Sequence, residues 1–252
     1  MFSSVKRAEE LLDALATFEV LPLGEIEELI HLGQKNEKVA SLIDKRLRDL
    51  AYESPGLWRG WLALAAGEVG REGVLACLET LGRDEGVSKN EGYEEHDETF
   101  IDDVMMPALM RNIGLVLNEA LVFAHQAESA AVRDRVYEAL DGVILNGDER
   151  GKNRLRTFAL ERWEVERVDG QARANAITIL IMLHHLGVDI APLIPEARGW
   201  AGADGFLTGE VNDVESVVSG KLDALNLARD VLALDWKANA KQVAARIGAK
   251  HD

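Results

Sequence analysis

The sequence is short of several kinds of residue, and each shortage excludes a class of protein. Its 252 residues include one cysteine, five prolines and 6% aromatic side chains. A single cysteine excludes a scaffold held together by disulfides and a zinc site built from several cysteines. No uninterrupted apolar run reaches the roughly 18 residues that a membrane-spanning helix needs, so we expect no membrane partner.

Basic residues are also scarce. The chain carries 28 Lys and Arg against 44 Asp and Glu, and its formal net charge is −16. This charge repels phosphate groups and argues against nucleic acid as a partner. The start of the chain, MFSSVKRAEELLDAL, lacks the apolar core of a secretory signal. We therefore expect a cytoplasmic protein whose thiol stays reduced.

Apolar residues are plentiful at 47%, and they recur at helical spacing along almost the whole chain. No segment alternates with the two-residue period of a strand, so the sequence predicts an all-α fold of short helices. The predicted helical segments are 4–18, 26–33, 39–50, 55–70, 74–82, 100–113, 115–126, 132–145, 150–163, 172–186, 190–200, 211–219, 221–235 and 238–247.

Two segments interrupt the helical pattern. Residues 82–98, GRDEGVSKNEGYEEHDE, have no apolar stripe, and we predict an acidic loop there, with Gly82 ending the preceding helix. The interval 82–103 holds nine acids and two bases, a net charge of −7. The second interruption, residues 199–209, contains four glycines.

The acidic interval supports three interpretations: a solvated loop, a docking surface for a basic partner, or a site for Ca²⁺ or Mg²⁺. It is no EF-hand loop, because the sixth position counted from Asp84 is Lys89 where that loop needs glycine. Tryptophans three residues apart could also anchor a partner, although core packing explains them equally well. The candidate partner-binding residues are Glu91, Glu94, Glu95, Asp97, Glu98, Asp102, Asp103, Trp58 and Trp61.

The sequence also repeats itself at an offset of 40 residues. SAAVRDRVYEALDGVILNG aligns with DGQARANAITILIMLHHLG, which pairs Arg133 with Arg173 and Leu140 with Leu180. Each copy is a helix closed by glycine and followed by a second amphipathic helix. Two helices in a period near 40 are typical of HEAT and armadillo arrays, in which stacked hairpins bury their apolar faces together.

The units around Arg133 and Arg173 resemble HEAT repeats, whose first helix typically carries such an arginine. The chain from residue 117 to 219, with HHLGVDIAPLIPEARGWAGADGFLTGEVNDVES, is similar to an uncharacterised bacterial family of HEAT-like proteins. LPLGEIEELIHLGQKNEKVASLI and WLALAAGEVGREGVLACLETLG also fit. The resemblance implies one α-solenoid domain over residues 1–252, with a capping helix near 238–247. Members often carry a cysteine-rich metal-binding tail. This sequence has no such tail, so the resemblance implies the fold but no metal site.

Motifs of catalysis are missing from the sequence. It has no phosphate-binding loop and no Gly-x-Ser-x-Gly motif. Cys77 lies on the apolar side of its helix, where we expect a buried, inert thiol. His184 and His185 are adjacent on a helix and point about 100° apart, which disfavours a shared metal. We assign no catalytic, cofactor-binding or metal-binding residue.

These observations favour a non-catalytic protein-binding or scaffold protein that uses the concave face of a solenoid. We expect the partner to be another protein with a basic surface, and a monomeric state. The alternative is an enzyme of HEAT-like type. Some HEAT-like proteins resemble chromophore lyases, and others resemble DNA-alkyl glycosylases. A glycosylase needs a basic groove, and a net charge of −16 argues against one.

Overall fold

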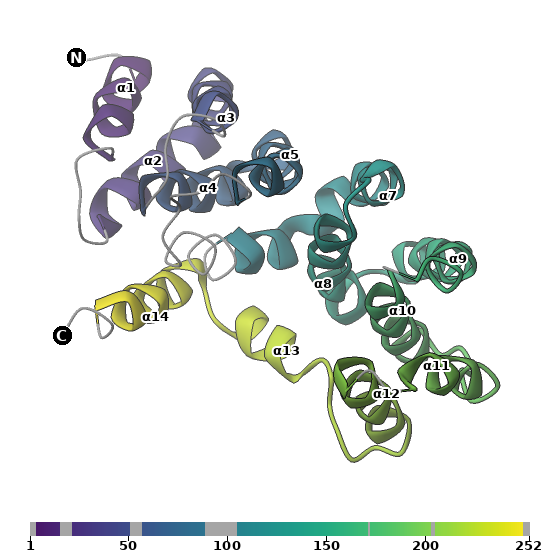
Figure 1. Cartoon of the computed structure of the whole chain (residues 1–252). Helices are drawn as coiled ribbons and strands as arrows, with labels where there is room; N and C mark the ends of the chain where they lie inside the picture. The colour runs from purple at the N-terminus through teal and green to yellow at the C-terminus, as the bar shows by residue number, and fades with distance from the viewer. Residues whose placement is uncertain are drawn as a thin grey trace. The chain divides into compact units, whose positions relative to one another are not determined.

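A computed structural model describes residues 4–15, 22–50, 57–88, 105–170, 172–202 and 205–248. Every regular element within these ranges is a helix, which confirms the all-α prediction (Figure 1). None of the helices described is both long and apolar enough to cross a bilayer.

The chain divides into two compact units. Unit 1 comprises Met1–Val116 and Val231–Asp252, and unit 2 comprises Leu117–Asp230. The chain passes from unit 1 to unit 2 between Val116 and Leu117, and returns to unit 1 inside a short helix, α13 (Asn226–Ala233). The single continuous domain expected from the sequence stays a prediction.

Unit 1 is organised around an almost wholly buried helix, α4. Its elements are α1 (Ser4–Leu15), α2 (Leu23–Lys35), α3 (Glu37–Leu50), α4 (Leu57–Val69), α5 (Arg71–Ser88), a helix over residues 105–112, the 3-10 helix η1 (Ile113–Val116) and α14 (Trp236–Gly248). Helix α4 packs against α2, α3 and α5, and every residue from Trp61 to Ala66 is buried. A helix that is apolar all round needs neighbours on all sides.

Glycine permits the closest approach in unit 1. A Cβ atom on Gly73 would lie 1.9 Å from the carbonyl oxygen of Ala66, so only glycine allows α5 to begin so close to α4. Gly67 likewise lets α4 approach the helix over residues 105–112, because a Cβ atom on Gly67 would lie 2.8 Å from the Cβ atom of Ala108. These contacts draw the helices around Cys77 into one core.

The predicted end of α5 is wrong. The helix continues through Gly82 to Ser88, so the first part of the expected acidic loop is helical. A glycine costs a helix about 1 kcal/mol relative to alanine, which weakens the helix without ending it. The C-terminal helix near 238–247 is confirmed as α14, and its role as a cap stays a prediction.

Unit 2 consists of helical hairpins with clear start and stop signals. Its helices are α7 (Leu117–Gln126), α8 (Ala130–Asn146), α9 (Glu149–Glu166), α10 (Arg173–His185), α11 (Ile194–Ala201), α12 (Gly205–Val218) and the start of α13. The side chains of Ser129 and Asp148 accept backbone N–H groups at the starts of α8 and α9.

Left-handed glycines end two of these helices. Gly187 has φ +79° and Gly220 has φ +70°, values that favour glycine over any residue with a side chain. After α10, the N–H of Val188 donates to the carbonyl of Leu183 at 3.0 Å, and an equivalent bond closes α12. This is the hydrogen-bond pattern of a Schellman motif, and it turns the chain sharply into the next segment.

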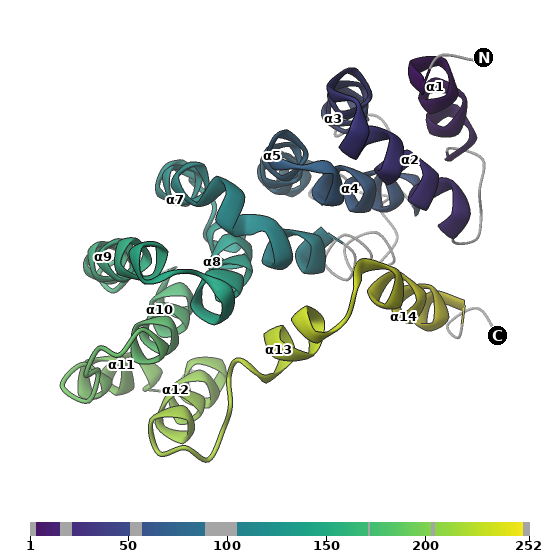
Figure 2. The same cartoon turned by 180° about the vertical axis from the view of Figure 1, so that it is seen from behind.

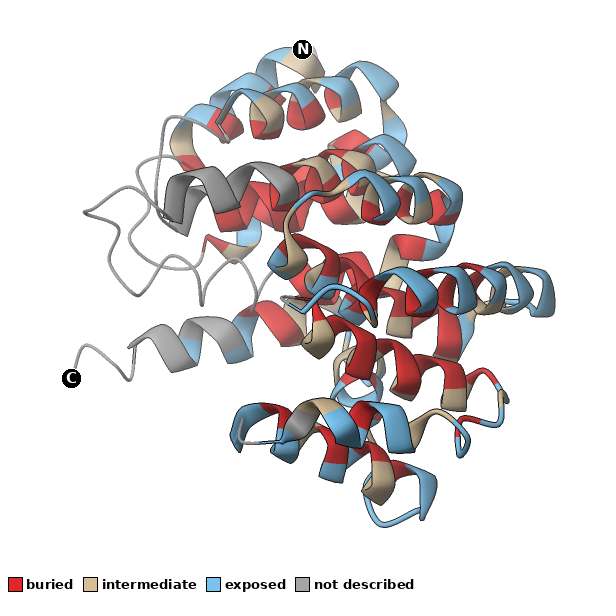
Figure 3. Cartoon of the chain, turned by 45° about the vertical axis from the view of Figure 1, so that its right-hand side comes forward, coloured by how far each residue is buried: buried red, intermediate tan, exposed pale blue. Residues whose placement is uncertain are grey.

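The helices of unit 2 lie in two layers. Helix α10 packs between α8 and α12, while α7, α9 and α11 form the other layer (Figures 1 and 2). Buried residues concentrate on the sides where helices meet, and the outward sides are exposed (Figure 3). The layer of α8, α10 and α12 therefore has an outward side that faces away from α7, α9 and α11.

Candidate functional site

The sequence-predicted partner site falls mostly outside the described residues. All seven of its acids, from Glu91 to Asp103, lie there, and so does the side chain of Trp58. Trp61 is 1% exposed, so it is a core residue of unit 1 and cannot anchor a partner, which corrects that part of the prediction. The same helix is apolar all round, and a three-residue spacing on such a helix cannot distinguish core from surface.

A different acidic surface lies on the outward face of α8, α10 and α12. Acids follow one another at spacings of four and three along α8, so they share one side of that helix. Half-buried residues of α10 lie beside them, and α12 adds two more acids. We call this surface the acidic face, and its residues are Asp134, Glu138, Asp141, Thr178, Ile181, Glu210 and Asp213.

Contacts between helices bring these residues together. The hydroxyl of Thr178 donates to Oδ1 of Asp134 at 3.0 Å, which ties α10 to α8. Burial is the main cause of the raised pKa of Glu210, and the charges of Asp213 and of Asp134 on α8 add to it.

Burial sets the protonation of this face. It raises the pKa of Asp141 to about 7, and the neighbouring charge of Glu138 adds to the rise. Burial also raises the pKa of Asp134, and it outweighs the opposing effects of Thr178 and Arg135. Carboxyl groups whose pKa is raised in this way gain from a cation that approaches them.

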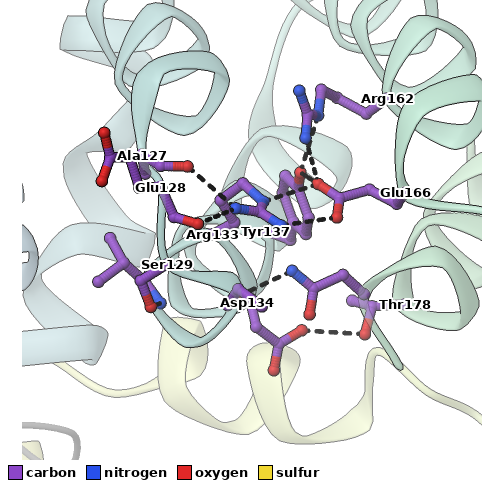
Figure 4. Close-up of polar contacts among 12 residues, drawn as sticks. Ala127, Glu128, Ser129, Arg133, Asp134, Tyr137, Arg162, Glu166 and Thr178 are labelled. Atoms are coloured by element: carbon purple, nitrogen blue, oxygen red, sulfur yellow. Dashed lines mark hydrogen bonds and ion pairs between the residues drawn. The ribbon is translucent and has the colours of Figure 1, made fainter. Parts of the chain in front are cut away.

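A buried ion network lies directly behind the acidic face (Figure 4). The guanidinium of Arg133 in α8 donates to both oxygens of Glu166 in α9, from Nε at 2.8 Å and from Nη2 at 2.9 Å. Its Nη1 donates to the carbonyls of Ala127 and Glu128, in the turn before α8. One side chain thereby joins the start of α8, the preceding turn and α9.

Two further donors complete the network around Glu166. The hydroxyl of Tyr137 donates to Oε1 at 2.9 Å, and Arg162 donates to the same oxygen. Glu166 is 1% exposed and both arginines are 6% exposed. Burial alone raises the pKa of Glu166, but hydrogen bonds from Arg133, Arg162 and Tyr137 outweigh it and lower the pKa. The carboxylate is therefore ionised and fully partnered.

The network positions the acidic face. Asp134 follows Arg133 in the chain, and Figure 4 shows the Asp134–Thr178 pair beside the network. Asn175 adds a second link, because its Nδ2 donates to the carbonyl of Ala130 at 2.8 Å. Sequence analysis singled out Arg133 but missed Glu166. The available signal was Arg162 four residues before Glu166, an ion pair on a helix side that also carries buried apolar residues.

Arg173, the repeat equivalent of Arg133, makes a related contact. Its guanidinium lies over the ring of Trp200 in α11, 5.8 Å from the ring centre. Trp200 in turn packs against Trp163 of α9, with ring centres 5.5 Å apart. Both repeat arginines thus reach forward to a helix of the other layer, one to a carboxylate and one to an aromatic ring.

Unit 1 contains a buried carboxyl group, that of Asp44, whose pKa shifts in the opposite direction to that of Glu166. Asp44 of α3 is 3% exposed, and its Oδ1 has no hydrogen-bond partner within the part of the chain that is described. Burial raises its pKa to about 6, although Arg48 opposes the rise. Nearby Cys77 is fully buried and donates to the carbonyl of Ala63 at 3.3 Å. This confirms the predicted buried thiol.

Neither a reactive thiol nor a metal-binding cluster is formed by the residues that the structure describes. Burial, followed by the charges of Asp44 and Glu68, raises the pKa of Cys77, which keeps the thiol protonated and unreactive. No set of three or more His, Cys, Asp or Glu side chains in the described ranges could hold a metal ion.

The sequence matches no protein-family model, and neither a curated protein nor a solved structure matches it significantly. The resemblance to HEAT-like proteins stays a prediction based on the repeat itself.

Proposed function

We propose that this protein is a non-catalytic binding protein whose acidic face holds a basic segment of another protein. The observation that carries the proposal is the cluster of acids on α8 and α12: Asp141 and Glu210 are half-buried, the others are exposed, and the pKa values of Asp134, Asp141 and Glu210 are raised. Such a surface gains free energy when lysine or arginine enters it. The proposal fits a net charge of −16.

We further propose that the helices form an α-solenoid of HEAT-like hairpins. Two observations support this architecture: the pairing of successive helices in unit 2 into two layers, and the equivalent placement of Arg133 and Arg173. Stacked hairpins create extended faces for proteins to bind along. The acidic face would be one stretch of such a surface.

The floor of the face suits the stems of basic side chains. Ile181 and Thr178 of α10 are half-buried between the acids of α8 and α12. Lysine and arginine place their methylene groups on apolar surface while their charged ends meet carboxylates. An extended basic segment could therefore lie along α10 with its charges directed to both sides.

The same geometry favours protein binding over the enzyme alternative. A glycosylase-like protein must attract the phosphates of DNA with a basic groove. The outward face of α8, α10 and α12 carries carboxylates instead.

Fluorescence anisotropy tests the proposal directly. The probe is a labelled peptide that alternates lysine with small apolar residues, and its counterpart carries glutamate at each lysine. We expect the basic peptide to bind and the acidic one not to bind. A variant with Asp134→Asn, Asp141→Asn and Glu210→Gln should bind the basic peptide at least about tenfold more weakly, since it removes three carboxylates from the site.

The matched control removes the same number of charges from the other layer. Glu149, Glu161 and Glu164 are exposed on α9, and changing all three to glutamine should leave the affinity within about twofold after correction for salt screening. Equal losses in both variants would show that only net charge matters. That result, or no binding of the basic peptide, would overturn the assignment of the site.

A further inference from the structure

The first turns of α9 carry a cluster of basic side chains, although the chain as a whole is acidic. Four bases lie within seven residues, and each of them is exposed or half-buried. Bases four residues apart share a flank of the helix, so Arg150 and Arg154 lie on one flank and Lys152 and Arg156 on the other. We call these four side chains the basic patch.

The basic patch differs from the other arginines of unit 2 in its partners. The arginines of this unit that form ion pairs with carboxylates are Arg133, Arg162, Arg167, Arg198 and Arg229. Within the described ranges, no base of the patch has a carboxylate partner. Arg154 donates instead to the amide oxygen of Asn118 at 2.6 Å, and Arg156 donates to the carbonyl of Leu186 at 2.9 Å. Neutral acceptors thus hold these guanidinium groups in place and leave their charge uncompensated.

The acidic face matches the basic patch in extent and is opposite in charge. Its acids on α8 run from Asp134 to Asp141, about two turns or roughly 10 Å of helix. Burial raises the pKa of Glu210 on α12 and the charge of Asp134 adds to the rise, so acids of two helices lie near one another. The basic patch also occupies about two turns, from Arg150 to Arg156.

We propose that the basic patch of one copy of the chain docks on the acidic face of a second copy. The inference rests on the proposed function, because it names α9 of another copy as the basic segment that the acidic face holds. Helix α9 belongs to one layer of unit 2 and the acidic face lies on the outward side of the other layer, so unit 2 cannot form this contact with itself (Figure 2). Two different surfaces meet in such a head-to-tail contact, and each copy keeps one of each for a further neighbour.

Complementary charges outweigh the net charge of the chain at short range. A net charge of −16 makes two copies repel at a distance. At physiological ionic strength this repulsion is screened beyond about 8 Å, whereas charges in a desolvated contact are screened much less. A carboxyl group whose pKa is raised by burial, such as that of Asp141, gains when a base approaches it.

Sedimentation velocity over a concentration series tests the proposal. The average mass of the unmodified chain should rise with concentration beyond that of a dimer in about 0.15 M salt. It should return to that of a monomer in about 1 M salt, where the screening length falls to about 3 Å. The first variant, Arg150→Glu with Lys152→Glu, reverses one base on each flank of the patch. It should need at least about tenfold higher concentration to associate, since like charges across a contact repel.

The matched control makes the same change in net charge at other places. Lys45 and Lys221 are exposed, and changing both to glutamate should leave the association within about twofold of that of the unmodified chain. The second variant, Glu138→Gln with Asp213→Asn, removes one acid from α8 and one from α12. It should weaken association by about tenfold, because the acidic face loses two charges.

Mixing the two variants shows which surfaces meet. The first variant keeps an intact acidic face and the second keeps an intact basic patch, so an equimolar mixture should form 1:1 dimers. Growth should stop there, because the two surfaces that remain are the altered ones. Circular dichroism checks that each variant keeps its helices. If the first variant does not, Arg150→Gln with Lys152→Gln replaces it.

Three outcomes would overturn the inference: a monomer at every concentration in about 0.15 M salt, a first variant that associates like its control, and a mixture that stays monomeric where unmodified chains associate. The proposed function has its own test in the basic peptide. If the peptide binds a chain that stays monomeric, the proposed function stands and only the docking of a second copy is rejected.

Discussion

Asp44 in unit 1 and Glu166 in unit 2 are equally buried carboxyl groups with opposite electrostatics. Asp44 is 3% exposed and Glu166 is 1% exposed. Burial raises the pKa of Asp44 to about 6, whereas three donors hold the pKa of Glu166 below its ordinary value. Their difference lies in partners: Glu166 accepts from two arginines and a tyrosine, while Oδ1 of Asp44 accepts no hydrogen bond.

The comparison shows that the hydrogen-bond partners of a buried acid, rather than its exposure, decide whether it stabilises the fold. Removing a carboxylate from water costs free energy, and only good hydrogen bonds offset that cost. On the acidic face, desolvation likewise raises the pKa of Asp134, Asp141 and Glu210, although Asp134 accepts a hydrogen bond from Thr178.

The largest effect should follow from removing the charge of Glu166. Glu166→Gln leaves Arg133 and Arg162 buried without their counter-charge, and breaking a buried pair in this way costs about 3–5 kcal/mol. Urea unfolding at neutral pH measures the loss. The control is Glu164→Gln, a change two residues before Glu166. It removes a solvent-exposed partner of Arg167 and should leave the urea midpoint nearly unchanged. Similar midpoints for both variants would refute the role of the network.

The opposite change is expected at Asp44. The folded state holds the proton of Asp44 up to about pH 6, while the unfolded chain releases it near its ordinary pKa of 3.8. The folded state therefore binds more protons between these values, and stability falls as pH rises through this window. Asp44→Asn should raise the free energy of unfolding by about 2 kcal/mol above pH 6.

The pH profile gives this prediction its control. Near pH 3, where Asp44 is protonated in both states, the variant and the unmodified chain should unfold at similar urea concentrations. Amide hydrogen exchange in α3 and α4 then shows whether the gain at neutral pH lies in unit 1. An equal gain at both pH values would mean that the carboxyl charge is not responsible.

Tyr137→Phe should have a smaller effect. It removes one donor to Glu166 and one acceptor for Nε of Arg162, yet both arginines and the carboxylate remain paired. We expect a loss of about 1–2 kcal/mol, the cost of leaving a buried polar group unsatisfied. The loss of stability is measured by hydrogen exchange of the backbone amides of α8 and α9. A loss as large as that of Glu166→Gln would assign the tyrosine a more central part.

The smallest effect concerns Cys77, whose native thiol should resist iodoacetamide at pH 8. Burial is the main cause of its raised pKa, and the charge of Asp44 adds to it. Asp44→Asn removes only the smaller contribution, the charge of Asp44, and leaves the thiol buried, so the rate of labelling of Cys77 should not change. Labelling should appear when urea unfolds unit 1. Rapid labelling of the folded protein would contradict the buried position.

The sequence predicted a large part of this fold. The helical spacing of apolar residues predicted the helices, and the offset of 40 residues pairs the sequence of α8 with that of α10, an equivalence that stays a prediction. Glycine signalled the end of α10 correctly at Gly187. At Gly82 the same signal failed, because a single glycine costs less than the neighbouring helical turns contribute.

The candidate site was harder to predict. Sequence analysis looked for a run of acids, whereas the acidic face assembles Asp134, Asp141 and Glu210 from helices far apart in the chain. Likewise, the position of Trp61 on a helix did not show that other helices would bury it on every side.

The sequence by itself determined the helices, the repeat and the net charge, because these depend on residues within a few turns of one another. Only the tertiary structure decided which charges lose their water and which of them find partners. Glu166 and Asp44 look alike in the sequence, and packing gave one three donors and left an oxygen of the other without any. Burial and hydrogen bonding are properties of neighbours in space, and the linear order of residues does not contain them.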